Sequence, residues 1–392
     1  MDKLNPDVLY LIVEFIGPFH DAITIFNLSC VNKSLSSTIS EHIANINKQI
    51  LNHNSFLAVS EPKSRFRLLN LLSYSSVILI AGSQDLRRCD TFDVSRNRFV
   101  KCCGLTFKRS EGFDATYHNG YVFVISGSDF LSIASIEAYD FTNNIWITFP
   151  PLPRKLTNLS CVSHNGDLYV VGGFDTSIPY KSSSILKLKL PYYTWETQSI
   201  SLGVGRSHHA SASYLGNIWV AGGLLQNPQV LASDTTEYFN PISGTVNQGP
   251  RMNRCRYKPR LLTLKSFRSI PSSNSSSSSN SSSSHYDLYV IGGDINMTNH
   301  SIGTIERLDM ETFSWVLVTT FPSDRLNCAI FALNDQTIYL FGGGDGTNML
   351  HSYDCYDILT GIWTTTISSP LAGRIRGFKS SLAVQIRPNY FR

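Results

Sequence analysis

The stretch Tyr169-Val170-Val171-Gly172-Gly173 decides the fold, because a short apolar run that ends in glycine recurs along the chain. The other copies are ILIAG (78–82), FVISG (123–127), WVAGG (219–223), YVIGG (289–293) and YLFGG (339–343). Successive final glycines are 45, 46, 50, 70 and 50 residues apart. A period of that size predicts an array of small structural units, each built from a few short strands.

Two further markers recur in phase with the final glycine of each unit. In four units a tryptophan follows the final glycine, by 19, 22, 22 and 20 residues: Trp146, Trp195, Trp315 and Trp363. We expect these side chains to pack between neighbouring units. An arginine precedes the final glycine by 17 to 19 residues in Arg65, Arg109, Arg154, Arg206 and Arg325. Together the three markers predict six units.

One unit is longer than the others because it carries an insertion. Arg256 precedes Gly293 by 37 residues, and residues 272–284 between them are all serine or asparagine. Such a tract has nothing to bury, so we predict a disordered insertion over about residues 268–285. Removing it restores the ordinary period.

The doublets and the tryptophan spacing resemble the kelch repeat over roughly residues 70–390. The resemblance implies a mainly β fold, a six-bladed kelch β-propeller that we place at residues 76–392. The first two units depart from the pattern, with Ala81-Gly82 and Ser126-Gly127 in place of a doublet.

A strand at the C-terminal end of the chain has no unit of its own. Because an unpaired edge strand is a liability, we predict that residues 378–386 complete the first blade near Val77, as in kelch propellers. Residues 66–72 occupy the same phase on the N-terminal side and are the competing candidate.

The first 50 residues lack the markers of the repeat and predict a small α-helical module, followed by a linker over 51–75. Asn5-Pro6-Asp7 is a typical helix start, with a capping side chain, a proline at the first helical position and an acid at the positive end of the dipole. The apolar residues that follow exceed what so small a module can bury within itself.

The patterns LNPDVL (4–9) and FNLSCVNK (26–33) resemble the F-box, over about residues 3–42. The pair Ser34-Leu35 departs from the basic and tryptophan residues common there. The resemblance implies a module that binds the Skp-type adaptor of an SCF ubiquitin ligase. The implied contact residues are Pro6, Leu9, Ile12, Phe15, Leu28 and Val31. The alternative is a helical cap that packs on its own propeller.

Composition narrows the class of protein. The net charge of +4 is small and dispersed, which argues against nucleic acid as a partner. The eight cysteines show no paired spacing and no signal peptide is evident, so we expect free thiols in the cytoplasm, with the nucleus as an alternative. The longest apolar runs are strand-sized, and we expect no membrane partner.

No catalytic constellation stands out, and we expect no enzyme activity, no metal and no cofactor. Some kelch propellers are copper oxidases, so histidines need attention. His208 and His209 are adjacent, and adjacent residues on a strand point to opposite faces, which makes them poor joint ligands. The basic residues between 251 and 260 predict a solvated patch.

The repeated arginines form the main candidate for binding. If they occupy equivalent loops, they ring one end of the central channel and would bind an acidic or phosphorylated peptide. The tentative set is Arg109, Arg154, Arg206, Arg256, Arg325 and Arg376. Alternatively, each arginine hydrogen-bonds loop carbonyls of its neighbouring blade and serves the repeat. Specificity is then expected in the unequal loops after the doublets.

The two resemblances imply a substrate-recognition subunit, with the propeller holding a protein substrate and the helices holding the adaptor of a cullin ligase. The alternative is a kelch scaffold, for example of the cytoskeleton, whose helices pack on its propeller. A propeller enzyme is the third possibility.

Overall fold

The computed structural model describes much of the chain from residue 76 to residue 385. The described residues are 76–81, 87, 89–93, 98–101, 103–109, 111–118, 121–129, 131–132, 134–140, 145–189, 193–226, 232–266, 285–294, 301–333, 335–345, 348, 350, 352–366 and 381–385. The predicted helical module with its adaptor-contact residues, the linker, the tract 272–284 and Arg376 lie outside them.

Six antiparallel sheets, each following a path of four strands, form the described part of the fold. From the inner strand outward they are β30 (Ser381–Gln385), β1 (Ser76–Ala81), β2 (Cys89–Asp93), β3 (Arg98–Lys101); β4 (Glu111–His118), β5 (Tyr121–Asp129), β7 (Ile136–Asp140), β8 (Ile145–Phe149); β10 (Ser160–His164), β11 (Asp167–Val171), β14 (Ser184–Lys189), β15 (Thr194–Ser201); β17 (Ala210–Tyr214), β18 (Asn217–Ala221), β20 (Thr236–Asn240), β21 (Thr245–Gln248); β22 (Arg260–Lys265), β23 (Tyr286–Ile291), β24 (Thr304–Asp309), β25 (Ser314–Thr320); and β26 (Ala329–Leu333), β27 (Thr337–Phe341), β28 (Tyr353–Asp357), β29 (Ile362–Thr366). Shorter strands lie off these paths: β6 (Leu131–Ser132), which pairs with β5; β9 (Leu156–Thr157), β12 (Phe174–Asp175) and β13 (Tyr180–Lys181), which form one small sheet; and β16 (Arg206–Ser207) and β19 (Leu224–Leu225), which form another.

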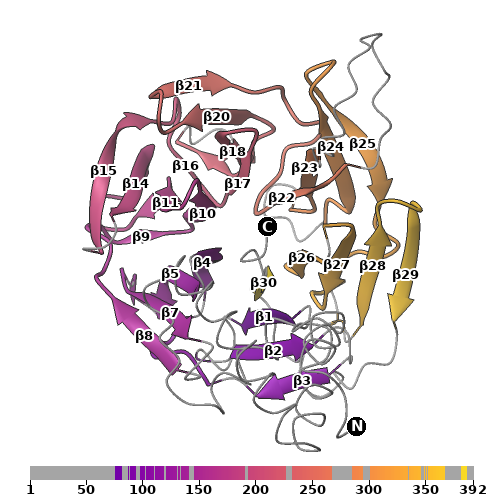
Figure 1. Ribbon diagram of the computed structural model, residues 1–392, viewed down its shortest axis with the longest axis horizontal. Helices are drawn as coiled ribbons and strands as arrows, with labels where there is room; N and C mark the ends of the chain where they lie inside the picture. The colour runs from indigo at the N-terminus through magenta and orange to yellow at the C-terminus, as the bar shows by residue number, and fades with distance from the viewer. Residues whose placement is uncertain are drawn as a thin grey trace, which may run out of the picture.

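The sheets are arranged around a central axis as the blades of a propeller (Figure 1). The inner strands contact one another in the closed order β30, β4, β10, β17, β22, β26 and back to β30. The described residues contain no helix, and the prediction of a mainly β fold is confirmed. Each blade lies between two others and buries both faces, which explains why strands such as β11 and β18 read as continuous apolar runs.

The first blade is closed by the C-terminal strand. β30 pairs with β1 in an antiparallel register from Val77 opposite Gln385 to Ala81 opposite Ser381. The prediction that residues 378–386 complete this blade is confirmed for the five residues of β30. The competing segment 66–72 lies outside the described residues.

The glycine doublets form the junctions between blades. Gly172 and Gly173 have φ angles of 58° and 106°, in the region that side chains disfavour. The N–H of Gly173 donates to the carbonyl of Arg206 in the next blade at 2.9 Å. A Cβ on Gly172 would lie 2.6 Å from that same carbonyl oxygen, so the close approach requires glycine. The repeat therefore keeps the doublet for a structural reason.

Four tryptophans each join their own blade to the preceding one. Trp146 and Trp195 donate their indole N–H groups to the carbonyls of Cys103 and Pro150, at 3.0 and 3.2 Å. Trp315 and Trp363 donate to the Pro250 carbonyl and the Thr319 hydroxyl, at 3.1 and 3.0 Å. Each acceptor belongs to the preceding blade or the segment that leaves it. The indoles are therefore used in the contacts between blades.

Candidate functional site

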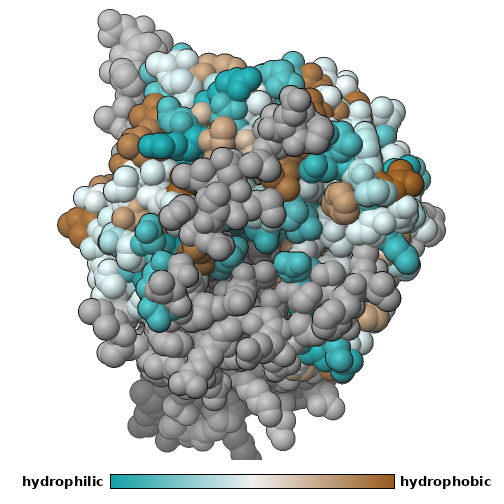
Figure 2. Space-filling model, turned by 180° about the vertical axis from the view of Figure 1, so that it is seen from behind, coloured by the Kyte–Doolittle hydropathy of each residue, from teal (hydrophilic) through white to brown (hydrophobic). Residues whose placement is uncertain are grey.

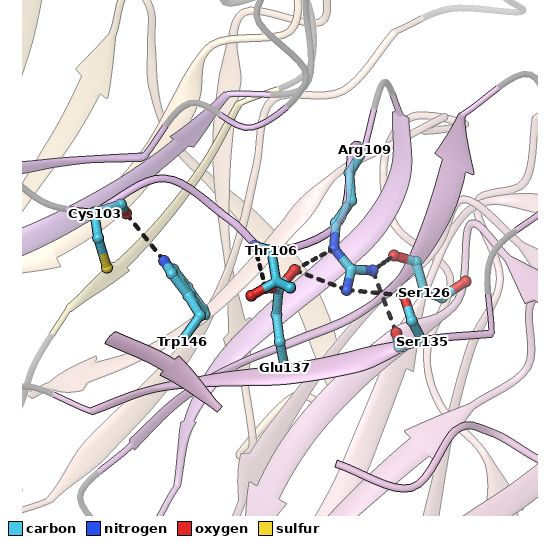
Figure 3. Close-up of polar contacts among 7 residues, drawn as sticks. All are labelled: Cys103, Thr106, Arg109, Ser126, Ser135, Glu137 and Trp146. Atoms are coloured by element: carbon cyan, nitrogen blue, oxygen red, sulfur yellow. Dashed lines mark hydrogen bonds and ion pairs between the residues drawn. The ribbon is translucent and has the colours of Figure 1, made fainter. Parts of the chain in front are cut away.

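Most of the arginines proposed as a binding ring lie in the interior of the protein. Arg109 is fully buried, and its Nε and Nη2 donate to Glu137 Oε1 at 3.1 and 3.0 Å (Figure 3). Its Nη1 donates to the carbonyl of Ser126, the first residue of the glycine pair in this blade. The second carboxylate oxygen of Glu137 accepts the backbone N–H of Thr106 at 2.7 Å. We call this arrangement an arginine clamp.

The same clamp recurs in three other blades. The pairs are Arg206 with Glu237, Arg256 with Glu306 at 2.6 Å, and Arg325 with Asp354 at 2.5 Å. In each clamp the guanidinium also donates to the carbonyl of the first glycine of the doublet. Burial lowers the pKa of Arg109, Arg206 and Arg256, and the neighbouring glutamate opposes that shift. Each clamp ties the glycine turn to the third strand of its own blade.

The third blade has no clamp. The register of its strands places Leu156 at the arginine position and Leu186 at the acid position, and both are buried. Val171 and Ala221 occupy equivalent positions, each just before the doublet of its blade. The residues one position earlier, Val170 and Val220, pair with Leu186 and Glu237, so Leu186 is the equivalent of Glu237. An apolar pair thus replaces the ion pair. Arg154, two residues before Leu156, is exposed and does not belong to the series.

The arginine-ring hypothesis is therefore corrected. Four guanidinium groups, those of Arg109, Arg206, Arg256 and Arg325, are enclosed and hydrogen-bonded within their blades, so they offer no surface to a peptide. Arg154 is exposed but out of register, and Arg376 lies outside the described residues. The alternative, that the arginines serve the repeat, describes the four clamps, except that the guanidinium groups bond carbonyls and a carboxylate of their own blade and not carbonyls of a neighbouring blade.

A different set of residues surrounds the central axis. A cavity of about 150 Å³, the axial cavity, is lined by residues that lead into the inner strands of five blades. Its rim consists of Gly112, Asn158, His208, Lys258 and Asn327. With one exception these residues follow the clamp position by two, so they are structurally equivalent; Gly112 follows Arg109 by three.

The rim has an unusual backbone. All five residues have left-handed φ angles, which are 72°, 52°, 57°, 52° and 51° in chain order. The N–H of Asn158 donates to Gly112 O, that of His208 to Asn158 O, and that of Lys258 to His208 O, at 2.7, 2.8 and 2.9 Å. Main-chain groups thus connect four blades in series. A left-handed conformation costs about 1–2 kcal/mol for residues with a side chain, least for asparagine, so His208 and Lys258 are held under strain.

The two histidines at the axial cavity are kept in their neutral form. Burial and the nearby Lys258, His209 and Lys181 hold the pKa of His208 well below its usual range. Burial lowers the pKa of His209 to about 3, and Arg206 adds to that shift. Among the described residues, neither ring nitrogen of His209 makes a hydrogen bond of ordinary geometry, although the Val171 backbone favours its charged form.

Lys258 is the cationic side chain of the rim. Its ammonium lies 5.3 Å from the centre of the Tyr257 ring and makes no ion pair within 4 Å among the described residues. Burial lowers its pKa, while the more distant carboxylates of Glu111 and Asp294 oppose that shift. A half-buried amine without a close counter-charge is suited to an anionic ligand.

Sequence patterns alone give a different picture of these residues. His208 and His209 are expected to point to opposite faces of a strand, yet both line the axial cavity, because His208 is left-handed and the alternation of a strand does not apply there. Lys258 and Arg260 are predicted to be solvated, yet they also line it. The usable signal is the position two residues after most of the repeated arginines.

Other kinds of site are not supported by the described residues. They contain no group of three or more histidine, cysteine or acidic side chains that could hold a metal ion. They also contain no helix long and apolar enough to span a membrane. On the face opposite that of Figure 1, the coloured surface intersperses hydrophobic and hydrophilic side chains (Figure 2).

Comparisons with known proteins agree with the fold. The kelch motif matches residues 111–153 and 277–322. Kelch-like protein 40 of Xenopus laevis is 45% identical over 65 residues, 16% of this chain and 11% of that protein. Its Xenopus tropicalis counterpart is 34% identical over 139 residues, 32% and 22% of the two chains. Kelch repeat and BTB domain-containing protein 1 of cowpox virus, strain Brighton Red, is 30% identical over 118 residues, 30% and 21%.

These similarities support a kelch-repeat protein, and the two matched kelch motifs lie between residues 111 and 322. The matched part spans less than a quarter of the length of these relatives. The F-box resemblance of the N-terminal residues lies outside the matched kelch motifs.

Proposed function

We propose that this protein is a substrate-recognition subunit that holds a protein substrate at the rim of the axial cavity. The observation that carries the proposal is the strained, cationic rim, where Lys258 has no close counter-charge among the described residues. Strain of this kind gathers at binding sites, where the surrounding structure maintains it. The unequal loops after the doublets would add selectivity around the rim, and no catalytic step is assigned.

We further propose that residues 3–42 bind a Skp-type adaptor, which would bring the substrate to a cullin ligase in the cytoplasm or nucleus. Support comes from the F-box resemblance and from the relatives, among which a kelch propeller joined to a second module has a precedent. The cowpox virus protein carries kelch repeats and a BTB domain by its name. The alternative is a scaffold whose N-terminal residues pack on the propeller.

Charge reversal at the rim tests the substrate site. Lys258→Glu is expected to weaken capture of the substrate from cell extract by at least about tenfold, since it places a like charge against an acidic partner. The matched control is Lys265→Glu, an exposed lysine at the other end of β22. Quantitative mass spectrometry of proteins retained by the full chain measures the effect. Equal recovery with both variants, at equal thermal stability, would contradict the site.

Adaptor binding has its own test. Leu9→Asp/Ile12→Asp is expected to reduce co-purification of the adaptor by at least about tenfold, because burying two carboxylates in an apolar interface is costly. The control is Lys48→Asp, outside the F-box-like segment. If wild type and the double variant retain the same amount of adaptor, the ligase proposal fails and the scaffold alternative is favoured.

A further inference from the structure

A salt bridge crosses the central channel at the axial cavity. Arg260 on β22 and Asp114 on β4 both line the cavity, and Arg260 Nη1 lies 3.2 Å from Asp114 Oδ1. In the order of inner strands, β4 and β22 are three places apart in both directions, so they face each other across the axis (Figure 1). Most hydrogen bonds between blades join neighbours, whereas this pair joins opposite blades.

The strand register explains why the arginine can reach so far. Asp114 and Arg260 each pair with the residue just before the glycine pair of their blade, so they lie at the same level of the channel. At that level the other blades carry Ser160, Ala210, Ala329 and, on β30, Leu382. The first three of these residues have small side chains, which leave room in the channel for the guanidinium.

The two partners differ in what else holds them. Asp114 Oδ2 accepts the backbone N–H of Cys161 at 2.8 Å and the hydroxyl of Ser160 at 3.3 Å. Among the described residues, the guanidinium of Arg260 makes only the hydrogen bond to Asp114, through one of its nitrogens. If Arg260 turned away, the carboxylate would keep two donors. Exchange of the arginine to another anion therefore leaves no buried carboxylate without hydrogen bonds.

The surroundings favour such an exchange. Lys258 lies two residues before Arg260 and lines the same cavity without a close ion pair among the described residues. His209, 6% exposed, also lines it with unpartnered ring nitrogens. The lining of the cavity thus holds two cationic side chains, Lys258 and Arg260, and one carboxylate, that of Asp114, which also has donors of its own.

We infer that Asp114 is a built-in occupant of the ligand site, and that an acidic side chain of the substrate binds by taking Arg260 from it. Lys258 supplies the second positive contact to the incoming carboxylate. This inference rests on the proposed function, and it names both the ligand chemistry and a restraint on affinity. In the free protein the carboxylate of Asp114 competes with every acidic ligand for Arg260, so partners that carry little negative charge do not bind.

The test uses the full chain and a fluorescein-labelled hexaglutamate peptide, with hexaglutamine as the uncharged control. Asp114→Asn is expected to bind hexaglutamate about tenfold more tightly than wild type, and Arg260→Gln about tenfold more weakly. In Asp114→Asn/Arg260→Gln the gain should vanish, because no arginine is left to release. Fluorescence anisotropy measures all four affinities.

The matched control for lost negative charge is Asp167→Asn. The carboxylate of Asp167, at the first residue of β11, pairs with Lys187 at 2.7 Å. Equal affinities for Asp114→Asn and Asp167→Asn would overturn the inference, as would a gain that persists without Arg260. Should Asp114→Asn unfold, Asp114→Ser replaces it, since β10 carries Ser160 at the same level. Capture through Lys258 is measured separately, so either result can fail alone.

Discussion

Glu237→Leu is expected to destabilise the propeller by about 3–5 kcal/mol, because it leaves the buried guanidinium of Arg206 without a counter-charge. Arg206→Leu should cost a similar amount, since the carboxylate is then buried alone. The double substitution Arg206→Leu/Glu237→Leu should recover most of this loss. The third blade already carries Leu156 and Leu186 at these two positions, both buried.

Equilibrium urea unfolding of the wild type and the three variants measures the coupling between the two sites. Glu196→Leu is the matched control, because Glu196 pairs with Lys189 at the surface, and its effect should stay below about 0.5 kcal/mol. Additive losses in the double variant would show that the blades do not tolerate an apolar pair, and the comparison with the third blade would then fail.

Ending the chain after residue 380 is expected to abolish cooperative folding of the propeller. This truncation removes β30, which pairs with β1 through five residues and contacts β4 and β26. At about 1 kcal/mol for each ladder hydrogen bond, several kcal/mol are lost. Without β30, the sides of β4 and β26 that contact it are also left exposed.

The control for this truncation ends the chain after residue 385 and keeps β30. Circular dichroism during thermal unfolding should show a normal transition for this longer protein and a broad or absent one for the shorter. If both unfold at the same temperature, closure by the C-terminal strand is not needed for stability.

The architecture of this protein could be predicted from its sequence because the repeat markers have fixed structural roles. Glycine is required where Gly172 approaches the carbonyl of Arg206, and the indoles fill the contacts between blades. The role of the arginines could not be predicted in the same way. Spacing groups them as one series, although Arg154 is out of register, and only the partner carboxylates on the third strands show that the other four face inward.

The third blade contains the sequence signal that the arginine and the acid of a clamp belong together. Where the arginine is absent at Leu156, the acid is absent at Leu186 as well. The sequence signal for the rim of the axial cavity is weaker, because its residues share a spacing from the repeated arginines and a backbone conformation but differ in type from blade to blade. A conformation common to Asn158, His208 and Lys258 cannot be seen from their side-chain types.

The hydrogen bonds that run through the rim have a consequence for evolution. Since main-chain groups of Gly112, Asn158, His208 and Lys258 hold the blades together there, the side chains are not needed for assembly. A single codon change in one blade can therefore alter which ligand is favoured while the ring stays intact. Duplicated genes of this design can diverge in partner choice one blade at a time, without passing through unfolded intermediates.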